Sequence, residues 1–201
     1  MLLSSSAVFE ALDERRLIIE PEPRPRYTGQ GGQRSPYDTT AINLTLGTTI
    51  LTLPPADERN AVNIDFTQHG NIPATLSRLY DAREMDSTGF RLLPNQLILA
   101  KTNEKITLPL TQINGKPLLA ARVEGKSSFA RCGLLIHFTA PTIHAGFSGT
   151  ITLEIICLGG YAIHLTPGMQ ICQLLIEEVL GQPEAFQGQF HGQTRPAGPS
   201  T

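Results

Sequence analysis

The sequence lacks a large excess of charge of either sign. Its 201 residues include 16 lysines and arginines against 18 aspartates and glutamates, which gives a net charge of −2 and a pI near 6.2. This balance predicts no nucleic-acid and no membrane partner, and leaves room only for a local basic site. No apolar run approaches a membrane span, and the start MLLSSSAVFEALDERR has no basic leader or long apolar stretch. We therefore expect a cytoplasmic protein without a secretory signal.

Cysteine is scarce, and metal-binding patterns are missing. Cys132, Cys157 and Cys172 lie beside apolar residues without CxxC spacing, which predicts buried, reduced thiols. The sequence also lacks the paired H-x-E and P-C-x-x-C motifs with which one class of hydrolases holds zinc. The histidines have no metal-ligand spacing, and His137 and His164 stand in alternating segments, so we expect them to be ordinary residues of a sheet. No zinc site is expected.

Alternation of apolar and polar residues dominates the rest of the chain. Eight segments alternate at period two, as strands with one buried face do. Turn pairs such as Asn114-Gly115 and Pro167-Gly168 separate several of them. Short strands at this spacing predict an all-β fold, a distorted β-barrel or jelly roll. The segments are 41–53, 95–102, 104–110, 118–125, 133–140, 149–158, 161–168 and 169–178.

The two ends of the chain differ from this central part. Residues 4–16 have capping serines and an apolar side, which predicts a short N-terminal helix. Residues 20–38 are rich in Pro, Gly and Arg and predict a loop, while 60–87 have no clear assignment. The expected domain is 1–181, followed by a flexible tail, 182–201. That tail cannot form a core, and is either disordered or ordered by a ligand or a neighbouring subunit.

The segment GKSSFARCG, residues 125–133, combines glycines, cations and hydroxyls within this strand-rich region. It contains the GKS half of a P-loop. However, Ala120 stands where the first glycine of that motif would be, and Gly133 stops the long helix that a P-loop needs. The P-loop is therefore excluded.

A short helix explains the same segment better, with Ser127 or Ser128 as its cap and Gly133 as its end. Its first N–H groups and the Lys126 ammonium would attract an anion. Ser127 and Arg131 are one turn apart and share one face. The alternative is a capped helical turn with a solvated arginine and no ligand.

Glu154 stands inside the apolar segment ITLEI. Alternation places Thr152 and Glu154 on one face, with Leu153 and Ile155 on the other. On the outside of a barrel such a glutamate would be solvated. If it points inward, burial would raise its pKa and suit it to act as a general base, with Arg131 as the partner that keeps it ionised.

Several of these segments occur together in one known family. Residues 121–155, ARVEGKSSFARCGLLIHFTAPTIHAGFSGTITLEI, are similar to the family motifs G-R-S-S-x-A-R-x-G-L and T-A-x-x-I-D-P-G-[FW]-x-G-x-I-x-L-E. SPYDTTAINLTLG, NQLILAKTNEKITLPL, LTPGMQICQLLIEE and FQGQ are similar to further family segments in the same order. The chain thus resembles the deoxycytidine triphosphate (dCTP) deaminase branch of the dUTPase-like superfamily over most of its length.

The resemblance implies a fold, an assembly and an activity. The fold is a distorted β-barrel or jelly roll, and the assembly is a homotrimer with active sites between subunits. Members of this branch remove the exocyclic amine of the cytosine ring of dCTP, which gives dUTP and ammonia, and some also hydrolyse the triphosphate to dUMP. The implied substrate is a deoxycytidine nucleotide, with Mg²⁺ bound through its triphosphate and no zinc.

The resemblance also implies catalytic roles. By position, Glu154 is the general base that activates water for attack on C4 of the ring. Ser127 and the backbone near Ala140 position that water. Arg131 holds the glutamate and the edge of the base.

Substrate contacts are implied at five further positions. Lys126 and Ser128 meet the phosphates, and lysine in place of the family's arginine keeps the charge but loses the bidentate fork. Thr152 and Leu153 line the pyrimidine pocket. Gln189, in the tail, closes over the nucleotide.

Besides Lys126, four positions depart from the family pattern. His144 stands where the family has the aspartate that meets the sugar 3′-hydroxyl; a histidine can bond a hydroxyl, but its charge changes near neutral pH. Asn43 replaces an aspartate of the first strand. Ala185 and Phe186 replace a lysine and a tyrosine of the tail. These changes bear on the grip on sugar and phosphates more than on the ring chemistry.

Two other functions stay open beside deamination. One is a dUTPase-like or bifunctional hydrolase that splits the α–β phosphate bond, although members that do so have an aspartate where this chain has His144. The other is a non-catalytic trimer that binds a nucleotide or a protein, and His144, Ala185 and Phe186 motivate it.

Overall fold

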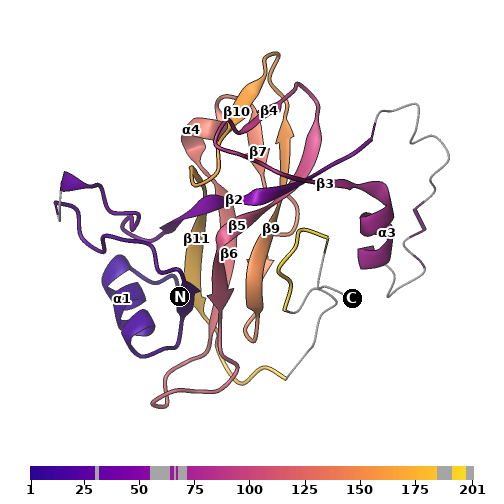
Figure 1. Cartoon of the computed structure of the whole chain (residues 1–201). Helices are drawn as coiled ribbons and strands as arrows, with labels where there is room; N and C mark the ends of the chain where they lie inside the picture. Colours follow the sequence, from indigo (N-terminus) through magenta and orange to yellow (C-terminus); the bar gives the residue numbers. More distant parts are fainter. Residues whose placement is uncertain (30–31, 55–63, 66, 68–71, 185–191, 198–201) are drawn as a thin grey trace.

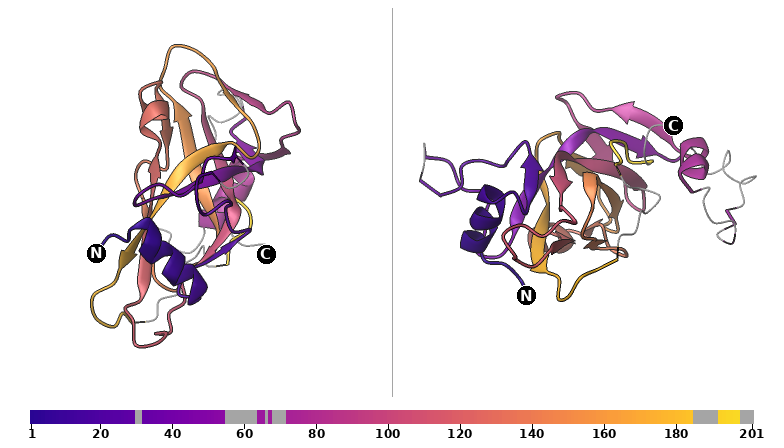
Figure 2. Two further views of the ribbon diagram at one scale, coloured as in Figure 1. Left: turned by 90° about the vertical axis from the view of Figure 1, so that its left-hand side faces the viewer. Right: turned by 90° about the horizontal axis from the view of Figure 1, so that it is seen from below.

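One curled β-sheet surrounds the core, with short helices at its margins (Figure 1). The computed structural model describes residues 1–29, 32–54, 64–65, 67, 72–184 and 192–197. Viewed from below, the strands curve around a common interior (Figure 2). The core is aliphatic, and Ile42, Leu44, Ile98 and Leu153 are fully buried in it. The predicted all-β barrel-like fold is confirmed.

The elements follow one another along the chain with few helices between strands. In order they are α1 (Ser5–Asp13), β1 (Ile18–Glu20), β2 (Ile42–Thr52), α3 (Ile72–Leu79), β3 (Asp81–Glu84), β4 (Phe90–Leu92), β5 (Leu97–Thr107), β6 (Leu119–Gly125), α4 (Ser127–Ala130), β7 (Leu134–Ile136), β8 (Thr142–Ile143), β9 (Ser148–Cys157), β10 (Ile163–Leu165) and β11 (Gln170–Glu178).

Antiparallel pairing arranges nine of these strands in a single sheet. The order is β7-β9-β5-β2-β11-β6-β8, with β1 added to β5 and β3 added to β2. β4 and β10 form a separate two-stranded sheet. β9 alternates strictly between more and less buried residues along its whole length. This alternation confirms that Thr152 and Glu154 share one face of the strand and Leu153 and Ile155 the other.

Two predicted strand boundaries are wrong, each for a local reason. Segments 95–102 and 104–110 form one strand, β5, whose pairing with β9 shifts register between Lys101 and Lys105. Such a bulge keeps the strand continuous while it interrupts the alternation. Segment 133–140 is a strand only as far as Ile136, because His137 adopts a φ of 52°. A left-handed backbone cannot continue a strand.

The helices also differ in part from their predictions. α1 is capped by Ser4, whose side chain accepts from Ala7 N at 3.4 Å, but it ends at Asp13 instead of Arg16 because Arg15 has a φ of 60°. The unassigned segment 60–87 contains α3 and β3. No helix in the described part of the chain is long and apolar enough to cross a membrane.

The predicted burial of the cysteines holds for two of the three. Cys157 and Cys172 are buried, and all three cysteines are free thiols. Burial raises the pKa of the Cys172 thiol, so this group stays protonated. Cys132 is exposed, because it lies in the turn that follows α4 and not in a strand.

Candidate active site

A cleft of about 930 Å³ lies beside β9. The loop that runs from β7 through β8 to β9 forms one wall, and α3 and the start of β5 supply other parts of it. A largely apolar cleft of this size with few polar groups is typical of a small-molecule site. The apolar side chains include Leu76, Leu97, Leu99, Ile143 and Phe147. The polar ones include His137, His144, Thr152 and Glu154.

The carboxylate of Glu154 is paired with an imidazole. His137 Nδ1 lies 3.0 Å from Glu154 Oε2, and the side chains are 7% and 34% exposed, respectively. His137 N also donates to the Glu154 carbonyl at 2.8 Å. Burial by itself raises the pKa of Glu154, but the hydrogen bond and charge of His137 outweigh it, so the pKa lies below its ordinary value. The carboxylate is therefore ionised at neutral pH while still partly open to the cleft.

The α4 segment lies outside this cleft. Ser127, Ser128 and Arg131 are exposed, and within the described part of one chain no ion pair joins Arg131 to Glu154. The expected serine cap is wrong. The helix already begins at Ser127, so both serines lie inside it, and Lys126 is the N-cap without a side-chain cap bond. Gly133 ends the turn as predicted, with a φ of 76° that favours glycine.

Lys126 is held by a chain of side-chain hydrogen bonds. Its Nζ donates to Asn43 Oδ1, and Asn43 Nδ2 donates to Asp38 Oδ2 at 2.9 Å and to Pro36 O at 2.8 Å. Gln173 Nε2 donates to the same Asp38 oxygen at 3.1 Å. Burial lowers the pKa of Lys126. The neutral amide of Asn43 thus lies between the Lys126 ammonium and the Asp38 carboxylate, so the two charges do not pair directly.

The C-terminal segment 192–197 lies along the outer edge of β9, as the yellow trace in Figure 1 shows. Thr150 N donates to Gln193 O at 3.1 Å, and Gln193 Nε2 donates to Thr150 O at 3.0 Å. Thr152 Oγ1 donates to Pro196 O at 3.3 Å. β7 pairs only with the far end of β9, so this segment covers the edge that β7 leaves open. Gln193 and Pro196 consequently form part of the cleft wall.

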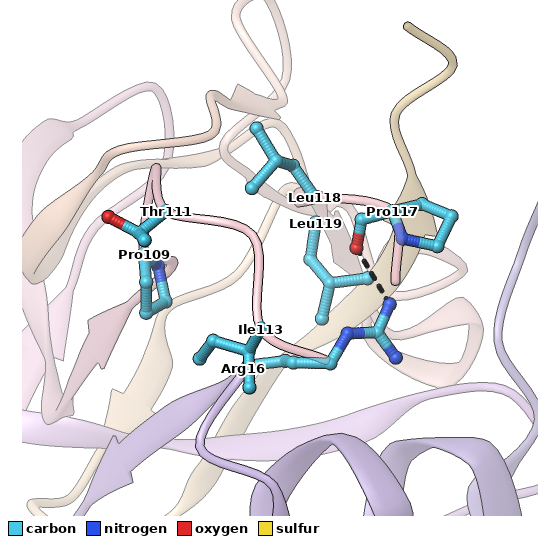
Figure 3. A pocket seen from close by; sticks show the side chains of 7 residues that line it. All are labelled: Arg16, Pro109, Thr111, Ile113, Pro117, Leu118 and Leu119. Atoms are coloured by element: carbon cyan, nitrogen blue, oxygen red, sulfur yellow. Dashed lines mark hydrogen bonds between the residues drawn. The ribbon is translucent and has the colours of Figure 1, made fainter. Parts of the chain in front are cut away.

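A second, much smaller pocket lies between α1 and the loop before β6 (Figure 3). Its volume is about 10 Å³, room for roughly one water molecule. The Arg16 side chain is 8% exposed and its Nη2 donates to Pro117 O at 2.8 Å. The bond from Arg16 ties the end of the N-terminal helical region to the loop before β6, and the pocket itself is too small for a substrate.

Metal ligands do not gather in the cleft. No group of three or more His, Cys, Asp or Glu side chains able to hold a metal occurs among the residues that the structure describes. The cleft is lined by two histidines, His137 and His144, and by two glutamates, Glu154 and Glu184, but these four do not form such a group.

Comparison with known proteins identifies the chain. The family model described as "dCTP deaminase-like" matches residues 2–179. The chain belongs to the dCTP deaminase-like family. The predicted membership of this branch, and of an enzyme family, is thereby confirmed.

Relatives in this family cover nearly the whole chain. A protein of Coprothermobacter proteolyticus named "dCTP deaminase, dUMP-forming" is 32% identical over 98% of this chain and 95% of that relative. One of Natronomonas pharaonis named "dCTP deaminase" is 31% identical over 98% of this chain and 92% of its own. The crystal structure of 2′-deoxycytidine 5′-triphosphate deaminase from Agrobacterium tumefaciens matches with a TM-score of 0.61 and 16% identity. That match covers 89% of this chain and 48% of the other, and it supports the fold.

The cleft of this family member brings together only part of the predicted site. Glu154, Thr152, His144 and Ala140 line it. The Leu153 side chain is fully buried in the core, so only its main chain can face a ligand. Lys126, Ser127, Ser128 and Arg131 lie elsewhere on the chain. Gln189, Ala185 and Phe186 fall outside the described residues.

The partner of Glu154 in this chain is His137, which the sequence interpretation took for an ordinary residue of the sheet. β7 and β9 pair with Ile136 opposite Ile155, and this register carries His137 to Glu154. In its apolar run, one predicted strand contains a single histidine, His137, and the other a single carboxylate, Glu154. Pairing the two strands in the register that sets Ile136 opposite Ile155 would have indicated the contact between His137 and Glu154.

Proposed function

We propose that this protein removes the exocyclic amine of dCTP by hydrolysis. The observation that carries the proposal is the ionised carboxylate of Glu154, held in a largely apolar cleft and partly open to it. In the reaction, the oxygen of water bonds to C4 of the cytosine ring and the bond from C4 to the amine breaks. Glu154 accepts a proton from the water and returns it to the leaving amine, so that ammonia departs.

The surroundings of Glu154 suit a pyrimidine. Thr152 and the main chain of Leu153 would meet the ring, and the main chain of Ala140 would orient the water. His144 would meet the sugar. Mg²⁺ enters as part of the substrate, bound to the triphosphate, since the residues of the cleft offer no ligand set of their own.

The remaining groups would come from a neighbouring subunit of a homotrimer. Ser127 and Arg131 are exposed on α4 and stand apart from their own chain's cleft. In a closed ring of three chains, α4 of one subunit would face the cleft of the next, which would bring Arg131 to Glu154 and Lys126 and Ser128 to the phosphates. Gln189 would close the tail over the nucleotide.

A second candidate function concerns the product. His144 stands where an aspartate serves phosphate hydrolysis in the family, which favours dUTP as the product. Relatives that cover nearly the whole chain are nevertheless named dUMP-forming. Hydrolysis of the triphosphate to dUMP and pyrophosphate after deamination is therefore the alternative to release of dUTP.

The test is turnover of dCTP with Mg²⁺, followed by chromatography of the nucleotides and assays for ammonia and pyrophosphate. Ammonia with dUTP supports simple deamination, and dUMP with pyrophosphate supports the second candidate. Glu154→Gln should lower kcat by roughly a hundred- to ten-thousandfold while nucleotide binding persists, because an amide cannot accept the proton. Glu20→Gln, an exposed carboxylate on β1, is the matched control. Nucleotide binding without ammonia release by the wild type would favour a non-catalytic trimer.

A further inference from the structure

His137 contacts Glu154 with both its main chain and its ring. The main-chain N–H donates to the Glu154 carbonyl at 2.8 Å, and Nδ1 lies 3.0 Å from Glu154 Oε2. These contacts occur where β7 ends, at a φ of 52°. A left-handed backbone at a residue other than glycine is strained and is kept where the surroundings over-determine it. The strained turn therefore coincides with the contact to the proposed base.

The contact between the two side chains is close but not aligned as a hydrogen bond. Among the described residues, neither ring nitrogen of His137 nor Glu154 Oε2 has a partner at hydrogen-bonding geometry, although Nδ1 lies 3.0 Å from Oε2. The other charged or titratable side chains around the cleft are His144, Glu184, Tyr80 and Lys101. His144 and Glu184 are exposed, and Lys101 Nζ donates to the Thr194 carbonyl at 2.9 Å. The ring of His137 is the titratable group that lies against the carboxylate, with Nδ1 at 3.0 Å from Oε2.

The burial of the two side chains is unequal. The ring is 7% exposed and the carboxylate 34%, so a ligand that enters the cleft would cover the carboxylate and leave the ring unchanged. Loss of water around a carboxylate raises its pKa and favours the protonated form, which cannot act as a base. A fixed donor on the buried side opposes that change.

We propose that His137 is a positioning residue: it fixes the Glu154 carboxylate from the buried side and keeps it ionised when the pyrimidine covers the open side. This inference rests on the proposed function for its meaning in catalysis. The ionisation of Glu154 by itself is independent of that function.

Two substitutions separate the charge of His137 from its geometry. In His137→Asn the amide nitrogen takes the place of Nδ1, so a donor stays beside the carboxylate without the charge, and asparagine tolerates the left-handed backbone. The acid limb of kcat/KM should then move up by about one pH unit, since an adjacent opposite charge lowers a carboxyl pKa by about that much or more. KM should change little, because the carboxylate stays in place.

His137→Gln moves the amide to the place of Nε2 and leaves the carboxylate without its donor. We expect kcat to fall roughly tenfold to a hundredfold at every pH, because the base is no longer fixed. The thermal midpoint of each variant is measured beside its kinetics. An unmoved pH profile in His137→Asn, together with wild-type kcat in His137→Gln, would overturn the inference.

A readout without turnover keeps this inference separate from the proposed function. The chain is labelled with ¹³C in its glutamate carboxyl groups, and the Glu154 signal is assigned by its loss in Glu154→Gln. In His137→Asn this carboxyl should titrate at higher pH than in the wild type. A wild type that titrates as expected but releases no ammonia would remove the proposed function alone, whereas equal titration in both chains would remove the inference alone.

Discussion

Glu104 on β5 and Glu154 on β9 are both carboxylates within strands of the main sheet, but they differ in burial and in their partners. Glu154 has an imidazole at 3.0 Å. Glu104 is 3% exposed and accepts from Thr45 N at 2.9 Å and from Thr45 Oγ1 at 2.6 Å. No ion pair in the described part of the chain includes Glu104. Burial raises the pKa of Glu104 above its ordinary value, although the bonds from Thr45 lower it in part. The two carboxyl groups are therefore shifted in opposite directions.

The raised pKa of Glu104 predicts a pH dependence of stability. Because the folded chain holds this proton more tightly than the unfolded chain, its contribution is complete below the ordinary pKa of 4.5 and is lost as pH rises through the folded value. Glu104→Gln keeps both bonds to Thr45 and removes the titration. The thermal midpoint of the variant should thus rise relative to wild type as pH increases above the ordinary pKa of 4.5.

Glu84 offers a control with the opposite sign. It is an exposed carboxylate bonded to Thr49 Oγ1 at 2.7 Å, and that hydrogen bond lowers its pKa. A lowered folded pKa adds stability that is lost as pH falls, so Glu84→Gln should become less stable relative to wild type as pH rises. Parallel curves for the wild type and Glu104→Gln would show that Glu104 does not titrate in this range.

At the scale of elements, two segments meet the outer edge of β9, the strand that contains Glu154. β7 pairs with residues 155–157, and His137, directly after β7, bonds the main chain of Glu154. Segment 192–197 covers the edge from Ser148 to Thr152. An open strand edge presents unpaired main-chain groups that require partners. The C-terminal segment supplies those partners beside the cleft.

Gln193 is the main anchor of that segment. It is 6% exposed, and both its carbonyl and its side-chain amide bond Thr150. Gln193→Ala should weaken the docking of the segment by about 1 kcal/mol, since a donor to a main-chain carbonyl is lost. Hydrogen exchange at the Thr150 amide should then be faster. Arg195→Ala, an exposed position of the same segment, should leave that exchange unchanged.

Alternation was sufficient to predict the longer strands, β2, β5, β6, β9 and β11, but not the short elements α3, β3, β4 and β8 or how the strands meet. It placed Glu154 and Thr152 on one face of β9, because side-chain direction in a strand has period two. It divided β5 in two, because a bulge interrupts that period without ending the strand. It missed the pair of His137 and Glu154, because that contact depends on strand register and on a left-handed residue, neither of which a local pattern specifies.

At the scale of the whole molecule, the proposed site is divided between two places. The cleft contains Glu154, whereas Arg131 directly follows α4 in an exposed turn. The family motif contains both residues, and within the described part of one chain they form no ion pair. The proposed cyclic trimer would remove this separation, because each subunit would give α4 to one neighbour and its cleft to the other.

Mixed trimers test this arrangement. Arg131→Ala and Glu154→Gln should each be nearly inactive alone, the first for lack of the cation and the second for lack of the base. When the two chains are unfolded together and refolded in equal amounts, an interface combines an intact Arg131 with an intact Glu154 about one time in four, so roughly a quarter of wild-type activity should return. Light scattering on each sample checks that the variants still assemble. If both residues served the cleft of their own chain, no mixed interface could combine them, and the refolded mixture would stay as inactive as its components.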